Sequence, residues 1–127
     1  MPLYAQTSGT LSTNSGTLTA IPGLSITLPG GVDVVVLVIL NLPNPYAQGS
    51  NYPGGTFAIS VNGLVSPVQA SFTYNEQVPP STGRIPTTLV VGVPLITQTQ
   101  TVLGLWAGVR GSNVIIDTPA TLSAVLS

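Results

Sequence analysis

Apolar and polar residues alternate with a period of two in several short segments of the chain. The alternation is clearest at residues 24–28, 56–61 and 121–126, where one side of each segment is apolar. A period of two is typical of strands that turn one face toward a core. No segment keeps the 3.6-residue period of an amphipathic helix. We therefore expect a chain of short strands with very little helix.

Glycine and proline divide the chain into these short runs. The 14 Gly and 12 Pro residues are spread evenly and form turn signals such as Pro22-Gly23 and Asn62-Gly63. About nine or ten strands at this spacing predict an all-β, two-sheet jelly-roll sandwich. Because no linker interrupts the pattern, residues 1–127 are expected to form one domain. The repeated Ser-Gly-Thr-Leu at 8–11 and 15–18 predicts the two arms of a hairpin.

Two segments, residues 34–40 and 89–96, are apolar on both faces of the predicted strand. In a sandwich only one face of a strand meets the core, so the second face needs another partner. Only 4% of the residues are charged, against about 25% in an ordinary soluble domain. With 43% hydrophobic residues and a mean hydropathy of +0.51, one subunit is not expected to cover its own apolar surface. These features predict a homo-oligomer.

The net charge of −1 leaves no basic surface for phosphates, so nucleic acid is not an expected partner. Direct membrane insertion is not expected either, because the apolar run at 34–40 is far shorter than the roughly 20 residues of a spanning helix. Residues 1–5 lack the basic start and apolar stretch of a secretory signal. The localisation stays open, with action outside the cell or at a cell surface expected if the protein binds sugars.

Catalysis is not expected from this set of residues. His, Cys and Lys are absent, which removes the common general bases and nucleophiles. Only three acids occur, Asp33, Glu76 and Asp117, and they are dispersed, so neither a metal site nor a resident cofactor is predicted. A glycosidase that uses Glu76 and Asp117 as its carboxylate pair remains an alternative reading.

The two cations, Arg84 and Arg110, are candidates for ligand binding. Each lies in a polar, glycine-containing stretch, and a guanidinium presents a planar set of donors suited to neighbouring sugar hydroxyls. The alternative is that each arginine pairs with an acid, Glu76 or Asp117, or is simply solvated.

Tyr46 and Tyr74 border predicted loops, where aromatic rings and phenol hydroxyls serve sugar sites; ordinary packing is the alternative for each. Trp106 is expected in the core.

Several blocks of the sequence resemble the N-terminal fucose-binding domain of a bacterial two-domain superlectin. The similarity runs nearly end to end and is strongest from residue 38 to residue 124. The blocks that carry it are residues 38–47, Phe72-Thr73-Tyr74, Ser81-Thr82-Gly83-Arg84, Val109-Arg110-Gly111-Ser112 and Ile116-Asp117.

The resemblance implies a tumour-necrosis-factor-like (TNF-like) jelly roll assembled as a homotrimer. It further implies a lectin that binds L-fucose and fucosylated cell-surface glycans between subunits, without calcium. On these blocks one subunit would supply Tyr46, Ser81, Thr82 and Arg84, and its neighbour would supply Thr73, Tyr74 and Arg110.

The loop at residues 48–52 differs from the family, with Tyr52 at a Phe position, and a further departure falls in the site itself. The family has a tyrosine where this chain has Thr56, so an aromatic wall of the site is lost or replaced, and Thr56 takes its place in the predicted site.

A structural or adhesive jelly roll that assembles without binding sugar is the alternative function.

Overall fold

The computed structural model describes residues 3–126, and every regular element in them is a strand. The strands are β1 (Tyr4–Gln6), β2 (Leu11–Thr13), β3 (Thr19–Leu28), β4 (Val35–Leu42), β5 (Tyr46–Gln48), β6 (Gly54–Val61), β7 (Leu64–Thr73), β8 (Thr87–Pro94), β9 (Gln100–Val109), β10 (Asn113–Ile116) and β11 (Thr121–Leu126). The all-β prediction is therefore confirmed. No helix in residues 3–126 is long and apolar enough to cross a lipid bilayer.

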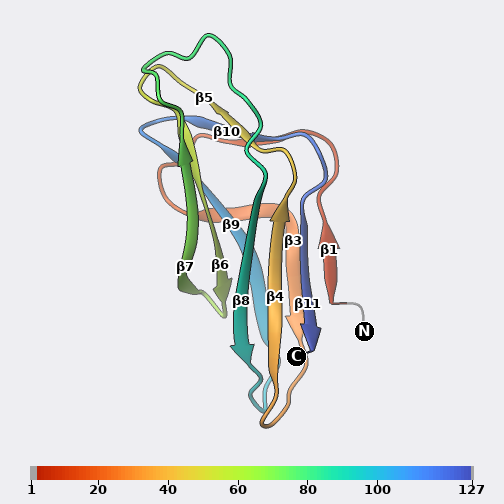
Figure 1. Ribbon diagram of the computed structural model, residues 1–127. Coiled ribbons are helices and arrows are strands. Elements are labelled where there is room, and N and C mark those ends of the chain that lie inside the picture. Colours follow the sequence, from red (N-terminus) through yellow and green to blue (C-terminus); the bar gives the residue numbers. More distant parts are fainter. Residues whose placement is uncertain (1–2, 127) are drawn as a thin grey trace.

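Two four-stranded antiparallel sheets face each other, as Figure 1 shows. One has the order β1-β11-β4-β8 and the other the order β3-β9-β6-β7, consistent with a β-sandwich. A smaller sheet, β2-β10-β5, lies across one end. The predicted hairpin of residues 8–18 is wrong: Leu11–Thr13 pairs with β10, and the carbonyl of Ser15 accepts a bond from Gly108 of β9. Its two halves therefore bond to different strands.

The core forms where the alternating faces meet. Leu24, Ile26 and Leu28 of β3 are buried while the residues between them are exposed, which confirms the predicted period of two. Trp106 is 2% exposed, as expected for a core residue, and Phe57 is fully buried. The core is completed by alternate residues of β4, β8 and β9.

The second faces of the doubly apolar strands remain open in the single chain. On β4, Val36, Val38 and Leu40 are buried, but Leu37 on the opposite face is 37% exposed. On β8, Val90 is 50% exposed between buried neighbours. An apolar surface therefore covers the outer side of the β1-β11-β4-β8 sheet.

Two of the four edge strands of the large sheets, β7 and β8, each contain a proline. Pro67 lies where the register between β6 and β7 shifts, and Pro94 is the last residue of β8. Proline cannot donate a backbone hydrogen bond, so it is tolerated at edges and bulges rather than in central strands.

Candidate functional site

The connection between β7 and β8, residues 74–86, lies along the free edge of β5 at one end of the sandwich (Figure 1). The Ile85 amide donates to the carbonyl of Pro45 (2.9 Å), and the Tyr52 amide donates to the carbonyl of Gln77 (3.0 Å). These backbone bonds hold the connection against residues 45–52, although it contains no regular element of its own.

The hydroxyl group of Tyr74 fastens the same connection from within. It donates to the carbonyl of Gly83 (2.6 Å) and accepts a bond from the amide of Ala47 (3.3 Å). Burial raises the pKa of Tyr74, so the phenol stays protonated and can keep donating. Tyr74 thereby joins the end of β7, the middle of β5 and the loop that carries Ser81 and Thr82.

Arg84 is the centre of a small polar cluster at this end. Its guanidinium carbon lies 4.1 Å from the centroid of the Tyr46 ring. Its Nη1 donates to Asp117 Oδ1 (2.6 Å) and to the carbonyl of Asn44 (3.2 Å). Because β5 pairs with β10, Tyr46 at the start of β5 and Asp117 just after β10 lie on either side of the arginine.

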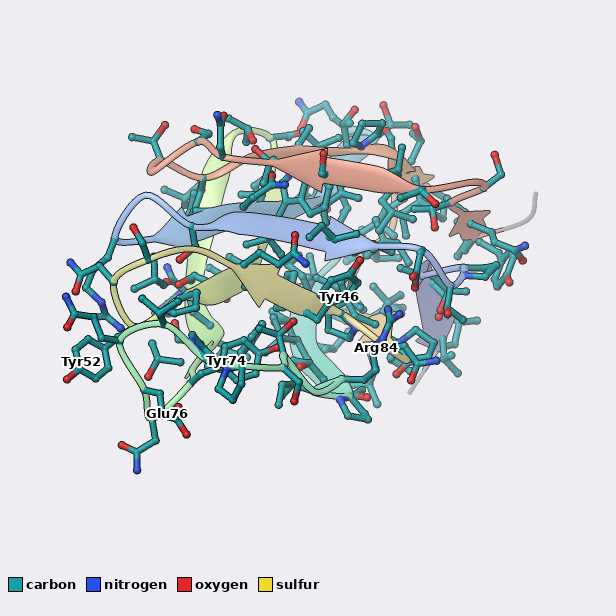
Figure 2. All side chains as sticks on the ribbon, turned by 90° about the horizontal axis from the view of Figure 1, so that it is seen from above. Tyr46, Tyr52, Tyr74, Glu76 and Arg84 are labelled. Carbon is teal, nitrogen blue, oxygen red and sulfur yellow. The ribbon has the colours of Figure 1, made fainter. Side chains whose placement is uncertain are left out.

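The ion pair affects both partners. The hydrogen bond to Arg84 lowers the pKa of Asp117, and the hydrogen bond to Asp117 raises the pKa of Arg84. Their side chains are 28% and 44% exposed, respectively, so the pair remains in contact with water. The prediction that an arginine pairs with an acid is thus confirmed for Arg84, whose partner is Asp117. Glu76, the other acid considered, lies at the rim of this end (Figure 2).

Pairing with Asp117 does not occupy all the donors of Arg84. Both bonds use Nη1, and within residues 3–126 the other nitrogens, Nη2 and Nε, have no hydrogen-bond partner. A guanidinium that is stacked and anchored on one side presents its remaining donors in a fixed direction. The cluster can therefore bind adjacent hydroxyl oxygens without breaking the ion pair.

Beside this cluster lies a polar hollow of about 230 Å³. Its walls are Gln48, Gly49, Pro79, Pro80, Ser81 and Thr82. Ser81 and Thr82, predicted from the sequence as ligands, thus line a real depression next to Tyr74 and Arg84.

Arg110 is held in a tight turn between β9 and β10. Arg110 and Gly111 have φ angles of 51° and 75°, and the Ser112 amide donates to the carbonyl of Val109 (3.1 Å), as in a type I′ turn. The side chain donates through Nε to the carbonyl of Asn51 (3.0 Å) and through Nη2 to that of Tyr52 (2.5 Å). In the described part of the chain Arg110 has no acidic partner.

Thr73 and Thr56 lie close to this turn in the sheet. Gly54 pairs with both Thr73 of β7 and Val109 of β9, which brings the end of β7 and the start of the Arg110 turn to the same strand. Thr56 is two residues further along β6, and its Oγ1 is 2.8 Å from Ser71 Oγ.

The predicted site residues form two groups in one chain. Tyr46, Tyr74, Ser81, Thr82 and Arg84 gather around the 74–86 connection, whereas Thr56, Thr73 and Arg110 lie along the first residues of β6. Figure 2 shows the spread, with Tyr46 and Arg84 together, Tyr74 between them and Tyr52 of the Arg110 group at the other side. Within its own chain Tyr74 contacts the first group. That Tyr74 also serves, with Thr73 and Arg110, as a ligand in the site of a neighbouring subunit stays a prediction.

The sequence did not identify Asn44 and Gln48 as members of the site, and it named Asp117 only as a possible ion-pair partner. Each lies at or near an end of β5 or β10. The signal that would have found them is the pairing of these two strands, which the alternation pattern does not encode.

Comparison with known proteins gives one family match. Residues 4–125 match the model of the family described as "Bc2l-C, N-terminal domain". No curated protein sequence is significantly similar to the chain. Among solved structures, dimeric latent PorU from Porphyromonas gingivalis aligns with a TM-score of 0.41 and 10% identity. That alignment covers 95% of this chain and 13% of the PorU chain, and so weak a likeness carries no conclusion about fold or function.

Proposed function

Since the chain belongs to the Bc2l-C N-terminal domain family, a lectin-related family, we propose that it is a lectin for L-fucose and fucosylated glycans. It binds them without calcium, in sites between the subunits of a homotrimer with a TNF-like jelly-roll fold, and it catalyses no reaction. The observation that carries the proposal is the arrangement of Arg84, which is stacked on Tyr46, anchored to Asp117 and left with free donors beside Ser81 and Thr82.

The chemistry of the Arg84 cluster suits a neutral, hydroxyl-rich ligand. Arg84 donates from Nη2 and Nε to adjacent ring hydroxyls, and Ser81 and Thr82 can each donate and accept. Asp117 offsets the charge of the arginine, so the cluster does not demand an anionic ligand. Tyr46 acts by orienting the guanidinium, since one face of its ring is covered by Arg84.

The Arg110 group is the complementary half of the site, contributed by the neighbouring subunit. It lies on a tight turn, and its guanidinium is bonded to two carbonyls, while within residues 3–126 Nη1 has no hydrogen-bond partner and can donate to a ligand. Two arginines from adjacent subunits then close on one sugar. A net gain of about 0.5–1.5 kcal/mol per hydrogen bond implies weak binding at one site, which several sites on one assembly strengthen by avidity.

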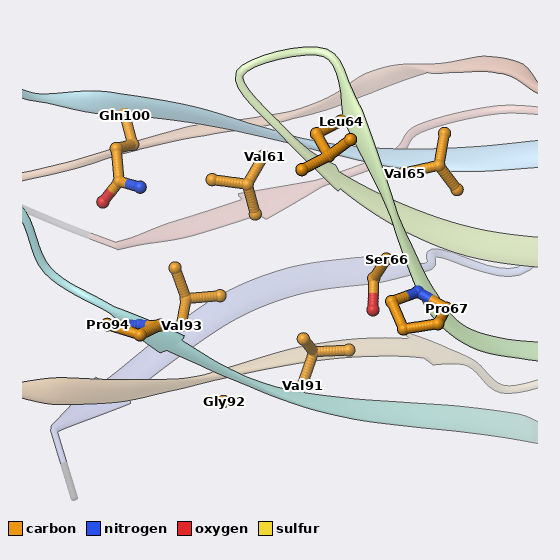
Figure 3. Close-up of a pocket in the computed structure, with 10 residues that line it drawn as sticks. All are labelled: Val61, Leu64, Val65, Ser66, Pro67, Val91, Gly92, Val93, Pro94 and Gln100. Atoms are coloured by element: carbon orange, nitrogen blue, oxygen red, sulfur yellow. The ribbon is translucent and has the colours of Figure 1, made fainter.

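The exposed apolar surfaces support the assembly. Leu37 and Val90 lie on the outer face of the β1-β11-β4-β8 sheet, and Val125 of β11 is 52% exposed. A hollow lined mostly by apolar side chains opens between β7 and β8 (Figure 3). A second and third subunit would cover such surfaces, whereas a monomer would leave them in water.

Calcium-independent binding, which is part of the proposal, suits the few acids of this chain. Calcium sites use several oxygen ligands, commonly including more than one carboxylate. Asp117 is bound to Arg84, and within residues 3–126 no three acidic or histidine side chains gather into a potential metal site.

The decisive experiment is a calorimetric titration of the purified protein with L-fucose, with and without EDTA, alongside light scattering to count subunits. We expect a trimer that binds fucose equally in both buffers. Arg84→Lys should bind at least about tenfold more weakly, because an ammonium cannot stack on Tyr46, pair with Asp117 and present a planar pair of donors. A trimer that binds neither fucose nor any glycan on an array would favour the adhesive alternative, and wild-type affinity in Arg84→Lys would remove Arg84 from the site.

A further inference from the structure

We propose that the apolar hollow between β7 and β8 is a second binding site, for a small uncharged molecule that combines an apolar ring with one hydroxyl group. The hollow is formed by residues 61 and 64–67 around the β6–β7 hairpin, residues 91–94 of β8 and Gln100 at the start of β9 (Figure 3). It lies toward the end of the sandwich away from the 74–86 connection (Figure 1). The site is therefore separate from the proposed sugar site, and its ligand belongs to another chemical class.

An irregularity in β7 opens this space. Between two regular pairs of β6 and β7, residues 66–68 of β7 stand opposite the single residue Ile59 of β6. A bulge of this kind bends its strand away from the regular sheet. Pro67 lies at the centre of the bulge, where its missing backbone donor breaks no ladder bond, and the Val68 amide donates to the Ser66 hydroxyl oxygen (3.2 Å). The hollow is thus a consequence of the local sequence of β7.

The walls of the hollow are in place before any ligand arrives. Asn62 and Gly63 at the tip of the hairpin have φ angles of 49° and 81°, as in a type I′ turn. The Asn62 amide donates to the Thr101 carbonyl (2.8 Å), and the Thr101 amide donates to Asn62 Oδ1 (2.8 Å). On the opposite wall, Val91 and Val93 belong to β8, which is paired with β4 along its length. A preformed space lowers the entropic cost of binding.

The lining favours an apolar, uncharged ligand. Only Ser66 and Gln100 carry polar side-chain atoms, and none of the lining residues is charged. The Ser66 hydroxyl oxygen already accepts the Val68 amide. An ion in this hollow would lose its water without gaining a counter-charge, which is costly. The ligand is therefore neutral, with Gln100 as its main polar contact.

Gln100 gives the ligand its hydroxyl group. The residue is 8% exposed, and its Oε1 is buried with no hydrogen-bond partner in the described part of the chain. Figure 3 shows its amide at one end of the hollow. The last torsion angle of a glutamine has a broad, two-fold profile, so half a turn exchanges the oxygen and the nitrogen at little cost. A hydroxyl group both donates and accepts and can pair with either atom, which relieves the cost of the unpaired oxygen.

The size of the hollow suits one ring. Its volume is about 230 Å³, and an apolar protein cavity of about 150 Å³ is large enough to bind benzene. The hollow therefore has room for a benzene-sized ring with a hydroxyl group and one short substituent. In the proposed trimer, a neighbouring subunit that covers the β7 and β8 edges would close over such a ligand.

The test uses p-cresol and p-xylene, which have nearly the same shape and differ by a hydroxyl group in place of a methyl group. Each is titrated into the wild-type protein and into Gln100→Leu, and the Val and Leu methyl signals are followed by NMR. We expect p-cresol to shift the signals of Val91 and Val93 in the wild-type protein. In Gln100→Leu the affinity for p-cresol should fall about tenfold, while that for p-xylene stays within about twofold. Gln98→Leu, an exposed position nearby, is the control and should change neither affinity.

Other outcomes would overturn the proposal. Unchanged p-cresol affinity in Gln100→Leu, or equal losses for both molecules, would refute a hydroxyl-selective site. Shifts scattered over the whole surface would show that the molecules partition non-specifically. No shift in the wild-type protein would refute the site; if a variant that does not assemble then shows the shift, a side chain of the neighbouring subunit fills the hollow instead. None of these results depends on fucose binding, which the calorimetric titration tests separately.

Discussion

The molecule carries two hollows of the same volume, about 230 Å³ each, with opposite chemistry. One lies between β5 and the 74–86 connection and is lined by hydroxyl, amide and proline groups. The other lies between the β6–β7 hairpin and β8, and its walls are mostly Val, Leu and Pro (Figure 3). Volume alone therefore says little about what a depression binds.

The two hollows differ more in how fully their polar groups are hydrogen-bonded than in how polar their linings are. Around the polar hollow the Tyr74 hydroxyl and the nearby backbone groups are paired with one another. In the apolar hollow Gln100 is 8% exposed, and its Oε1 is buried without a partner within residues 3–126. The polar groups around the first hollow are paired within one chain, and its lining suits a hydrophilic ligand. The second is apolar and unfinished, as expected for a surface that another subunit covers.

The largest effect is expected from a charge placed on the exposed apolar face of β8, which the proposed assembly buries. Val90→Lys adds an ammonium to the outer face of β8, the face opposite to that on which Val91 lines the apolar hollow. We expect monomers in light scattering and a fall in fucose affinity of about 100-fold or more, because the charged hydrogen bonds of the neighbour's arginine are lost. Thr10→Lys, a control at an exposed position between β1 and β2, should remain trimeric. A trimeric, fully active Val90→Lys would show that this face is not buried in the assembly.

A smaller effect is expected when the hydrogen bonds that hold the 74–86 connection against β5 are removed. Tyr74→Phe removes the hydroxyl that bonds Gly83 and Ala47, at about 0.5–1.5 kcal/mol for each bond. Fucose affinity should fall about tenfold, with a modest decrease in the unfolding temperature, in calorimetric titration and thermal melts. Tyr4→Phe is the matched control, since the Tyr4 hydroxyl bonds only the neighbouring Gln6 side chain at the surface. Equal behaviour of the two variants would contradict the fastening role of Tyr74.

The apolar hollow should accept an apolar side chain in place of Gln100. Gln100→Leu removes the unpaired buried oxygen, whose desolvation costs about 1–3 kcal/mol. We expect the unfolding temperature to rise by a few degrees with fucose affinity unchanged. Gln98→Leu, at an exposed position nearby, should leave the unfolding temperature as it is. A lower unfolding temperature in Gln100→Leu would mean that the amide has a partner in the assembled protein.

The smallest expected effect is that of pH on the polar end. The hydrogen bond from Arg84 lowers the pKa of Asp117 in the folded protein. The ionised carboxylate is therefore more stable in the folded state than in the unfolded chain. Its contribution to stability is complete above the ordinary value of 3.8 and is lost as the pH falls through the lowered pKa of the folded state. Fucose binding should be constant between about pH 8 and pH 5. An NMR titration of the Asp117 carboxyl carbon, with Asp117→Asn to assign the signal, checks the direction of the shift.

The alternation of apolar residues was enough to predict the fold class and much of the core. Leu24, Ile26, Leu28 and Trp106 are buried as expected, because burial of one face is a local property of a strand. The exposed second faces of β4 and β8 were also predicted, from residues 34–40 and 89–96. The hairpin at residues 8–18 was wrong because a local repeat does not determine which distant strand supplies the hydrogen bonds.

Only part of the candidate site could be predicted from the sequence. The resemblance placed Tyr46, Ser81, Thr82 and Arg84 in one group, and the structure brings them to one end. The carbonyl of Asn44 and the hollow wall at Gln48 depend on how residues 74–86 lie against β5. That packing joins residues some 40 positions apart through Arg84, and no short-range pattern records it.

The prolines of the edge strands β7 and β8 have a consequence for how copies of the chain can associate. In a nearly uncharged chain, edge strands with exposed apolar side chains, such as β7 and β8, are exposed to edge-to-edge pairing with another copy. Pro67 and Pro94 each remove a backbone donor at these edges, which disfavours continuation of the sheet by a strand of another copy. At these two edges we therefore expect copies to meet through side chains rather than by strand addition, which favours the closed assembly proposed above over a growing sheet.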